Sequence, residues 1–447
     1  MQFRQFYLGC LSHASYYIGS NGEAAVIDPQ RDVGQYLDEA AAHGQTIKYV
    51  IETHSHADFV SGHVELASKT GAKIVYGQRA DTKFETLKVN DGDVLKVGDV
   101  TLTVRETPGH TPEGITIIAE EPGEPLKVFT GDTLFIGDVG RPDLVGSVGF
   151  TSEQMAAMLY DSIHSKILPL PDTAEIYPAH GAGSLCGKSL SKETWSTLGE
   201  QRRFNYALQP MSRDEFVRIV ASGLPEVPQY FPKSAARNLE GSPSLEQLPK
   251  PRELTTDEVL AFQGVVIDVR KNDEYGAGHV TKSINIGLGG QFASWAGTLI
   301  PIGTPLAIVA ATAEQVDEAA MRLARVGHDT VSAYILIDDY TAERKEVEQV
   351  SVGDTSTQTT ADGIQFVDVR RAAEYESGHA ARARNIPLDK LADRVDEIDP
   401  TLPTYVICQG GYRSSIGCGI LENAGFSQLY NVNGGTAAWL ESRLPAE

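Results

Sequence analysis

Residues 53–63 read Thr53-His54-Ser55-His56-Ala57-Asp58-Phe59-Val60-Ser61-Gly62-His63, and this stretch decides how the first part of the chain is interpreted. It follows an apolar, β-branched run, Ile47 to Ile51, which predicts a buried strand. Residues two apart on an extended segment point the same way, so His54, His56 and Asp58 are expected on one side of a strand-end loop. Imidazole and carboxylate groups suit zinc or iron(II). For this stretch taken alone, a solvated polar loop is the alternative.

Three further loops, each after a strand-like run, carry a residue of the same ligand types. These are His110 in Thr107-Pro108-Gly109-His110-Thr111-Pro112-Glu113-Gly114, Asp132 in Thr130-Gly131-Asp132-Thr133, and His180 in Pro178-Ala179-His180-Gly181. Prolines and glycines beside these residues favour defined turns. Because sites are commonly built from loops on a rigid sheet scaffold, four such loops predict one metal site where they converge.

The chain has 447 residues and a formal net charge of −22. This length predicts about three domains. The acidic balance argues against nucleic acid or an anionic membrane as partner, although it permits a small anionic substrate at a locally positive site. The sequence has no apolar run of transmembrane length and no signal-peptide-like start. Four cysteines at unrelated spacings do not suggest a disulfide framework, so a reducing, cytoplasmic setting is expected.

An internal repeat follows a stretch of linker composition at residues 223–255. The repeat pairs Val266-Ile267-Asp268-Val269-Arg270 with Phe366-Val367-Asp368-Val369-Arg370, and Glu274-Tyr275 and Gly278-His279 with Glu374-Tyr375 and Gly378-His379. Each copy reads strand, helix, strand, helix, which predicts a small α/β domain with a parallel sheet. We therefore expect three domains, at residues 1–235, 236–352 and 353–447.

The two copies differ where chemistry is expected. In the second, a strand from Thr404 to Ile407 leads into Cys408-Gln409-Gly410-Gly411-Tyr412-Arg413-Ser414-Ser415, and a helix follows. Backbone N–H groups and the start of a helix favour the thiolate form of such a cysteine, and Arg413 adds positive charge. A buried, inert cysteine is the alternative. In the first copy Ala310 stands opposite Cys408, so that copy is expected to be a structural or docking unit.

These motifs resemble two known families. The first part resembles a metallo-β-lactamase-fold domain, with the loop motifs THSHAD, TPGHTPEG, FTGDTLF and YPAHGAG. The repeats resemble rhodanese (sulfurtransferase) domains, with IDVR or VDVR, GH, and a CxxGxR loop in the second copy. Together they are similar to the bacterial persulfide dioxygenase–rhodanese fusion proteins. The resemblance implies an α/β fold class, with a metallo-β-lactamase αβ/βα sandwich followed by two rhodanese-like α/β domains with parallel sheets.

The resemblance also implies the metal. Hydrolytic members of the superfamily usually read HxHxDH, and the last histidine helps to hold a second metal. Here Phe59 stands at that position and cannot ligate. Persulfide dioxygenases use one Fe(II) per metallo-β-lactamase-fold domain, held by two histidines and one carboxylate. Matched motif by motif, the ligands fall on His54, His110 and Asp132, and the groups that would orient them on His56, Asp58 and His180.

The activity implied is oxidation of a low-molecular-weight thiol persulfide by O2 to sulfite and thiol. Sulfur transfer at Cys408 to sulfite would then give thiosulfate and serve sulfide detoxification. Catalytic roles are expected for Cys408 and Arg413, and substrate contacts for Arg141, Gln409, Gly410, Gly411 and Tyr412. A surface ion pair is the alternative for Arg141. Cys186, just past the His180 loop, is expected to serve packing, with a secondary thiol near the site as the alternative.

Two other functions stay open at this point. One is a zinc-dependent thioester hydrolase of the glyoxalase II kind with accessory sulfurtransferase domains. The other is a non-catalytic sulfur carrier or sensor that only stores sulfur on Cys408. The persulfide-bearing thiol could be glutathione, coenzyme A, bacillithiol or mycothiol. The expected partners are thus small molecules (persulfide, O2 and sulfite), and self-association into a homo-oligomer is also expected.

Overall fold

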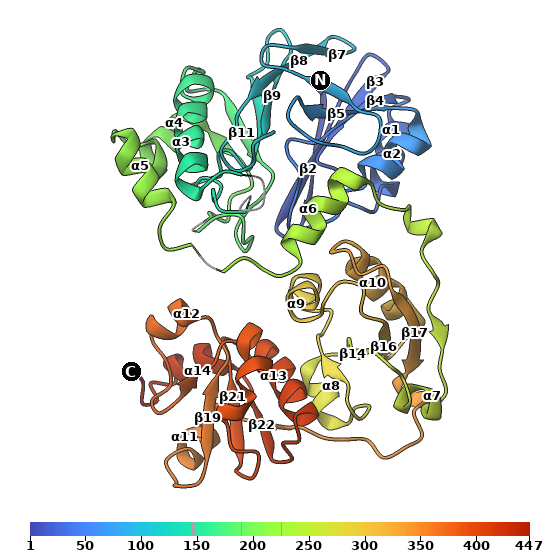
Figure 1. Cartoon of the computed structure of the whole chain (residues 1–447), viewed down its shortest axis with the longest axis vertical. Helices are drawn as coiled ribbons and strands as arrows, with labels where there is room; N and C mark the ends of the chain where they lie inside the picture. Colours follow the sequence, from blue (N-terminus) through green and yellow to red (C-terminus); the bar gives the residue numbers. More distant parts are fainter. Residues whose placement is uncertain (145–148, 189, 225) are drawn as a thin grey trace. The chain divides into compact units, whose positions relative to one another are not determined.

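The structure is a computed structural model that describes residues 1–144, 149–188, 190–224 and 226–447 (Figure 1). The chain divides into a first unit, Met1–Leu248 with Ala324–Gly327, and a second unit, Pro249–Leu323 with His328–Glu447. Within the described ranges, no helix is both long enough and apolar enough to cross a membrane.

Two six-stranded sheets form the first unit. The first sheet has the order β1 (Gln2–Leu8), β2 (His13–Ser20), β3 (Glu23–Ile27), β4 (Thr46–Ile51), β5 (Lys73–Gly77) and β6 (Leu87–Val89). The second has the order β12 (Ser196–Thr197), β11 (Glu175–Pro178), β10 (Lys127–Gly131), β9 (Ile115–Glu120), β8 (Val100–Glu106) and β7 (Val94–Val97). Strands β3 to β6 run parallel, and β10 runs parallel to β11.

The core of this unit lies between the two sheets. Strand β8 alternates buried and half-buried residues, as expected for a strand with one face on the core. One hydrophobic cluster joins Ile18 and Val75 of the first sheet to Leu102 and Phe129 of the second. The two sheets thus pack face to face and form the two inner layers of the predicted sandwich.

Helices cover the outer faces of both sheets. Helices α1 (Gly34–Ala42) and α2 (His63–Thr70) bury apolar residues against the first sheet. Helices α3 (Ser152–Ser162), α4 (Leu198–Phe204) and α5 (Arg213–Val220) bury theirs against the second. The predicted metallo-β-lactamase αβ/βα sandwich is therefore confirmed.

Part of the stretch with linker composition is a helix. Helix α6 (Phe231–Glu240) begins with a proline in its first turn, where the missing N–H has no helical partner to lose. Its buried residues Phe231, Ser234 and Asn238 lie on one face, at spacings of three and four. They pack in the first unit, so the prediction of a linker is wrong for residues 231–240.

The second unit contains two five-stranded parallel sheets with the same strand order. The first is β13 (Arg252–Glu253), β17 (Val331–Leu336), β16 (Leu306–Ala310), β14 (Val265–Asp268) and β15 (Ile284–Asn285). The second is β18 (Glu348–Val350), β22 (Leu429–Val432), β21 (Thr404–Ile407), β19 (Gln365–Asp368) and β20 (Arg384–Asn385). The shared topology agrees with the internal repeat.

Helices surround each of these sheets. The first repeat contributes α7 (Thr256–Leu260), α8 (Asn272–Ala277), α9 (Phe292–Leu299) and α10 (Ala313–Ala324). The second contributes α11 (Val352–Gln358), α12 (Ala372–Glu376), α13 (Tyr412–Asn423) and α14 (Gly435–Glu441). Both repeats are thus the rhodanese-like α/β domains that the sequence predicted.

Candidate metal centre and thiol site

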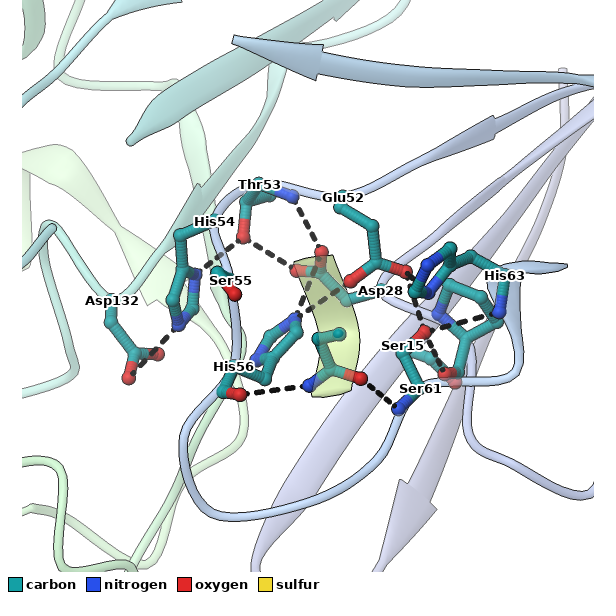
Figure 2. A network of polar contacts seen from close by, with 12 residues as sticks. Ser15, Asp28, Glu52, Thr53, His54, Ser55, His56, Ser61, His63 and Asp132 are labelled. Carbon is teal, nitrogen blue, oxygen red and sulfur yellow. Dashed lines mark hydrogen bonds and ion pairs between the residues drawn. The ribbon is translucent and has the colours of Figure 1, made fainter. Parts of the chain in front are cut away.

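Three loops of the first unit bring together two histidines and one carboxylate. His54 follows β4, His110 lies beyond β8, and Asp132 follows β10 directly. Their candidate ligand atoms all lie within 4.8 Å of one another, and the three side chains are buried. Figure 2 shows the ring of His54 turned toward Asp132. The structure therefore groups the three residues on which the motif match placed the metal.

Hydrogen bonds fix which nitrogen of His110 faces the centre. Its Nδ1 lies 2.8 Å from the carbonyl oxygen of Arg141. A carbonyl only accepts, so Nδ1 carries the hydrogen and Nε2 keeps its lone pair. That Nε2 is 3.3 Å from Oδ2 of Asp132.

The same argument applies to His54 through a longer chain of contacts. The hydroxyl of Thr53 donates its one hydrogen to Oδ2 of Asp28 at 2.8 Å. It must then accept at the 2.9 Å contact with Nδ1 of His54, so Nδ1 carries the hydrogen. Nε2 of His54 is left with its lone pair, 3.7 Å from Oδ2 of Asp132. Outer hydrogen bonds of this kind set the orientation of metal-binding histidines.

The atoms facing the centre have the properties of metal ligands. Nε2 of His54 and Oδ2 of Asp132 are buried and make no hydrogen bond to any described residue. Buried polar atoms without partners are costly, and a divalent cation would satisfy both. Burial opposes ionisation of Asp132, but the His180 imidazole, which lies beside it and hydrogen-bonds Oδ1, outweighs burial and holds the pKa of Asp132 well below the ordinary value. Two imidazoles and one carboxylate suit iron(II) or zinc.

His180 lies on the other side of Asp132, between two carboxylates. Its Nδ1 is 2.8 Å from Oδ1 of Asp132, and its Nε2 is 2.9 Å from Oδ2 of Asp58. Burial lowers the pKa of His180, but the two carboxylates outweigh burial and raise that pKa well above its usual value. The thiol of Cys186 lies within 4.8 Å of ligand atoms of Asp58 and His180. Cys186, for which the sequence favours packing over a thiol near the site, therefore lies beside the candidate metal centre.

His56 faces a second polar network behind the centre (Figure 2). Its Nε2 is 3.2 Å from Asp28 and 3.5 Å from Glu52. Burial lowers the pKa of His56, but the Asp28 carboxylate outweighs burial and raises it. His54 and His56 therefore turn to different partners, although their ring centroids are 4.1 Å apart. The expectation that both point the same way differs from the structure because β4 ends at Ile51.

Several further residues of this region carry no motif that marks them in the sequence. Asp28 follows β3 directly, so the strand-end pattern used for Asp132 could have found it. Its φ of 51° is a left-handed conformation that Asp tolerates better than most residues. Glu52 accepts a hydrogen bond from Ser61 at 2.6 Å and lies 3.4 Å from His63. No motif indicated this network, because the folded loop creates it.

Phe59 forms an apolar wall of the site. It is 1% exposed, and its ring centroid lies 4.1 Å from that of His13 and 4.5 Å from that of His56. A phenyl ring there excludes water and offers no ligand atom. His13, at the start of β2, is a further buried residue that no motif indicated.

Arg141 is buried and paired with an acidic residue of its own loop. It is 1% exposed, donates to both carboxylate oxygens of Asp143 at 2.7 and 2.8 Å, and also donates to the carbonyl oxygen of Leu185. The surface ion pair is therefore wrong, since the pair has a buried guanidinium. A substrate contact by Arg141 stays a prediction.

The second candidate site surrounds Cys408, at the end of β21 in the second repeat. Its sulfur accepts hydrogen bonds from the backbone N–H of Gly411 at 3.1 Å and the hydroxyl of Ser414 at 3.4 Å. Cys408 itself is 1% exposed, while the next two residues of its loop, Gln409 and Gly410, are exposed. Donors aimed at the sulfur favour a negative charge on it.

Arg413, the second residue of helix α13, is already paired. Its guanidinium donates to both carboxylate oxygens of Glu374 at 2.6 Å. At the matching place in the first repeat, buried Ala310 ends β16. The two repeats thus share a scaffold and differ in the loop that could carry chemistry.

Comparison with known proteins agrees with this division. The profile of the metallo-beta-lactamase superfamily matches residues 8–180, and that of the rhodanese-like domain matches residues 252–342 and 352–442. Persulfide dioxygenase ETHE1, mitochondrial, of Homo sapiens is 33% identical over 236 residues, which cover 50% of this chain and 82% of the human protein.

Two further relatives widen the comparison. A hydroxyacylglutathione hydrolase of Hahella chejuensis is 30% identical over 223 residues, which cover 48% of this chain and 76% of that protein. The crystal structure of a metallo-beta-lactamase from Staphylococcus aureus subsp. aureus COL is 34% identical with a TM-score of 0.68, covering 75% of this chain and 98% of that one. The chain therefore belongs to the metallo-beta-lactamase superfamily, as a fusion of a persulfide-dioxygenase-like domain with two rhodanese-like domains.

Proposed function

We propose that the chain oxidises a low-molecular-weight thiol persulfide and transfers sulfur to the product. In residues 1–235, a persulfide R–S–SH, O2 and water give the thiol R–SH, sulfite and two protons. In residues 353–447, Cys408 carries sulfane sulfur from a second persulfide to sulfite, which gives thiosulfate. Residues 236–352 supply no thiol. Both sites on one chain raise the effective concentration of sulfite at Cys408.

One observation carries the first half of this proposal. Two imidazole nitrogens and one carboxylate oxygen, held by loops far apart in sequence, face one another in a buried space. Phe59 stands where a further ligand would be needed for the two-metal hydrolases described above. We infer that His54, His110 and Asp132 hold one Fe(II). When bound, iron held by three protein groups would supply open positions where persulfide and O2 can bind side by side.

The protein groups around that position orient the ligands and exclude water. Thr53 and the carbonyl of Arg141 keep the hydrogens of His54 and His110 on Nδ1. His180 holds Oδ1 of Asp132, which leaves Oδ2 for the metal. Phe59 and the buried walls keep bulk water from the site, which strengthens every charge interaction inside.

Sulfur transfer at Cys408 takes place in two steps, with the loop donors holding the charge on the sulfur. The thiolate of Cys408 attacks the terminal sulfur of R–S–SH, so a bond to that sulfur forms while the S–S bond of the substrate breaks. The thiol R–SH leaves with a proton. Sulfite then attacks the terminal sulfur of the Cys408 persulfide, and thiosulfate departs as the thiolate returns. The N–H of Gly411 and the hydroxyl of Ser414 hold the returning charge.

Zinc-dependent thioester hydrolysis is the second candidate for the first unit. It is favoured by the hydroxyacylglutathione hydrolase relative, and by Asp58 and His180 on the far side of Asp132. A sulfur-carrier function without oxidation is the third candidate, since it needs only Cys408.

The test is metal content together with oxygen uptake of the full chain. We expect about one iron per chain, with O2 consumed on addition of glutathione persulfide or coenzyme A persulfide. Two zinc ions per chain and hydrolysis of a glutathione thioester would replace the oxidation proposal with the hydrolase. An iron-loaded chain that consumes no O2 but accepts sulfur on Cys408 would leave the carrier.

A further inference from the structure

Helix α13, which begins at the thiol loop, lies with one face against the first repeat. The hydroxyl of Ser415 donates to Oδ1 of Asn285 at 2.7 Å, and Glu422 lies 3.0 Å from Nε2 of His279. Gly419 falls between them, where an added Cβ would lie 3.2 Å from Cα of Ile284. With Tyr412, these positions are three, four and three residues apart, so they share one side of the helix.

An apolar core continues across the same boundary. One hydrophobic cluster contains Ile267 and Trp295 of the first repeat together with Ile416 and Leu421 of helix α13. Burial of apolar area in one shared cluster stabilises the two repeats as a pair. The helix that carries the thiol loop is therefore anchored in the copy that has no thiol.

Tyr412, the first residue of helix α13, is held closely by the first repeat. The hydroxyl of Tyr412 donates to the carbonyl oxygen of Gly287 at 2.8 Å. At Gly290 an added Cβ would lie 2.5 Å from the Tyr412 ring, so only glycine leaves room for the ring there. Arg322 of α10 donates to the carbonyl oxygens of Leu288 and Gly290 at 2.8 and 3.2 Å. Residues 287–290, which we call the 287–290 loop, thus form a fixed surface against which the Tyr412 side chain packs.

A second connection holds the residue before Tyr412. The side-chain amide of Asn431 donates to the carbonyl oxygen of Gly411 at 3.2 Å and to Oε1 of Gln349 at 2.8 Å. The same Oε1 lies 3.4 Å from Nδ2 of Asn272 in the first repeat. Gln349 therefore links the first repeat to the backbone of the thiol loop.

We propose that the first repeat is a positioning partner for the thiol loop, and that Tyr412 and Gln349 are the residues through which it acts. Gly411 has a φ of 102°, a conformation open to glycine, and glycine loses much backbone freedom when it is fixed. Holding Gly411 and Tyr412 from outside directs the Gly411 N–H at the sulfur of Cys408, 3.1 Å away. This inference rests on the proposed sulfurtransferase role of Cys408.

Two adjacent glycines give a matched test in the full chain. Gly290→Ala places a methyl group against the Tyr412 ring, whereas Gly289→Ala meets nothing within 4 Å. The readouts are thiosulfate formation, O2 uptake at the first unit, and the pH profile of Cys408 alkylation by iodoacetamide, followed by mass spectrometry of its peptide. We expect Gly290→Ala to slow thiosulfate formation roughly three- to ten-fold. It should also shift the pH profile of Cys408 alkylation up by about half to one pH unit, because the loss of one hydrogen bond to the sulfur would destabilise the thiolate by about that much. Gly289→Ala and the O2 uptake of both variants should match the parent.

A double-mutant cycle then tests the route through Tyr412. If Gly290→Ala acts through the ring, it should add nothing in a Tyr412→Ala background. Tyr412→Phe, which removes only the hydroxyl, and Gln349→Met, which nearly keeps the side-chain volume, should each shift the alkylation profile in the same direction. These two variants decide the matter if Gly290→Ala does not fold.

The outcomes separate this inference from the proposed function. Unchanged alkylation profiles in folded Gly290→Ala, Tyr412→Phe and Gln349→Met would overturn the positioning role. A parent chain that forms no thiosulfate, but whose alkylation profile shifts in these variants, would overturn the proposed transfer to sulfite and leave the positioning role intact.

Discussion

At the candidate metal centre the three candidate ligands come from three loops, whereas the thiol site is one continuous run, residues 408–414. His54 and His110 are oriented by the hydrogen bonds that their Nδ1–H groups donate to the Thr53 hydroxyl and the Arg141 carbonyl oxygen. The sulfur of Cys408 is instead held mainly by donors of its own loop. The metal centre therefore depends on the fold of a whole unit, whereas the donors of the thiol site come from one short loop, which we propose the first repeat holds in position. Substitutions at the two sites should consequently impair different activities of the chain.

Cys408→Ser gives the largest expected effect and separates the two sites. Thiosulfate formation should stop, because a serine hydroxyl has no thiolate to accept sulfane sulfur. Oxygen uptake should continue, and sulfite should accumulate in place of thiosulfate. Anion chromatography of the products checks this, with Cys10→Ser as the control that should behave as the parent. Thiosulfate formed by Cys408→Ser at the parental rate would remove Cys408 from the reaction.

The different construction of the two sites also decides how much the sequence predicts. The fold class was predictable throughout, because strand-like runs, turn residues and the repeat are local signals. The thiol loop was predictable for the same reason, since Cys408 and Gly411 are neighbours in sequence. The convergence of His54, His110 and Asp132 was predictable only because each follows a strand of one sandwich.

What the sequence did not indicate lies in contacts between distant segments. Nothing near Asp28 indicates that it meets Thr53, and the sequence near Cys186 does not decide between packing and a place beside His180. Helix α6 was hidden by its composition, because proline, serine and glycine usually mark linkers, while its buried face forms only against the folded unit. The docking of α13 on the first repeat is likewise a tertiary contact with no local motif.

His54→Ala should have the next largest effect, confined to the first unit. It removes one of the three candidate ligand atoms, so the loss of iron affinity should exceed the roughly 10–100-fold cost of losing an outer partner. Oxygen uptake should fall with it, while sulfur loading of Cys408 from added persulfide should persist. Elemental analysis and chelator competition measure the iron, with His43→Ala on the exposed end of α1 as control. Full iron occupancy in His54→Ala would refute the ligand assignment.

Thr53→Val tests whether side-chain hydrogen bonds around His54 orient it for metal binding. Valine matches the shape of threonine but cannot connect Asp28 to Nδ1 of His54. We expect iron affinity to fall about 10–100-fold, the range found for outer partners of metal ligands. Chelator competition on the purified chain measures it without reference to turnover. Thr53→Ser keeps the hydroxyl and should restore most of the affinity; equal affinities for valine and serine would show that the hydroxyl does not matter.

Glu374→Gln should have the smallest effect, a small loss of stability. It alters one partly exposed side-chain contact, whereas the sulfur of Cys408 is held mainly by donors of its own loop. Burial raises the pKa of Glu374, but the Arg413 guanidinium outweighs burial and holds that pKa below its ordinary value. A carboxyl group with a lowered folded pKa stabilises the protein above its unfolded pKa of about 4.3, and this contribution is lost as the pH falls through the folded value.

The pair should therefore contribute at neutral pH and vanish in acid. Since the Glu374 side chain is 34% exposed, solvent screening limits the expected loss in Glu374→Gln to about 0.5–1 kcal/mol at pH 7. Glutamine keeps the acceptor oxygen that caps α12, so the change isolates the charge. The Tm difference between parent and variant should shrink as the pH falls from about 6 toward 3, with Glu376→Gln on the same helix as control. A difference independent of pH would mean that the pair acts by packing, and the thiol site would then depend on side chains more than its backbone donors suggest.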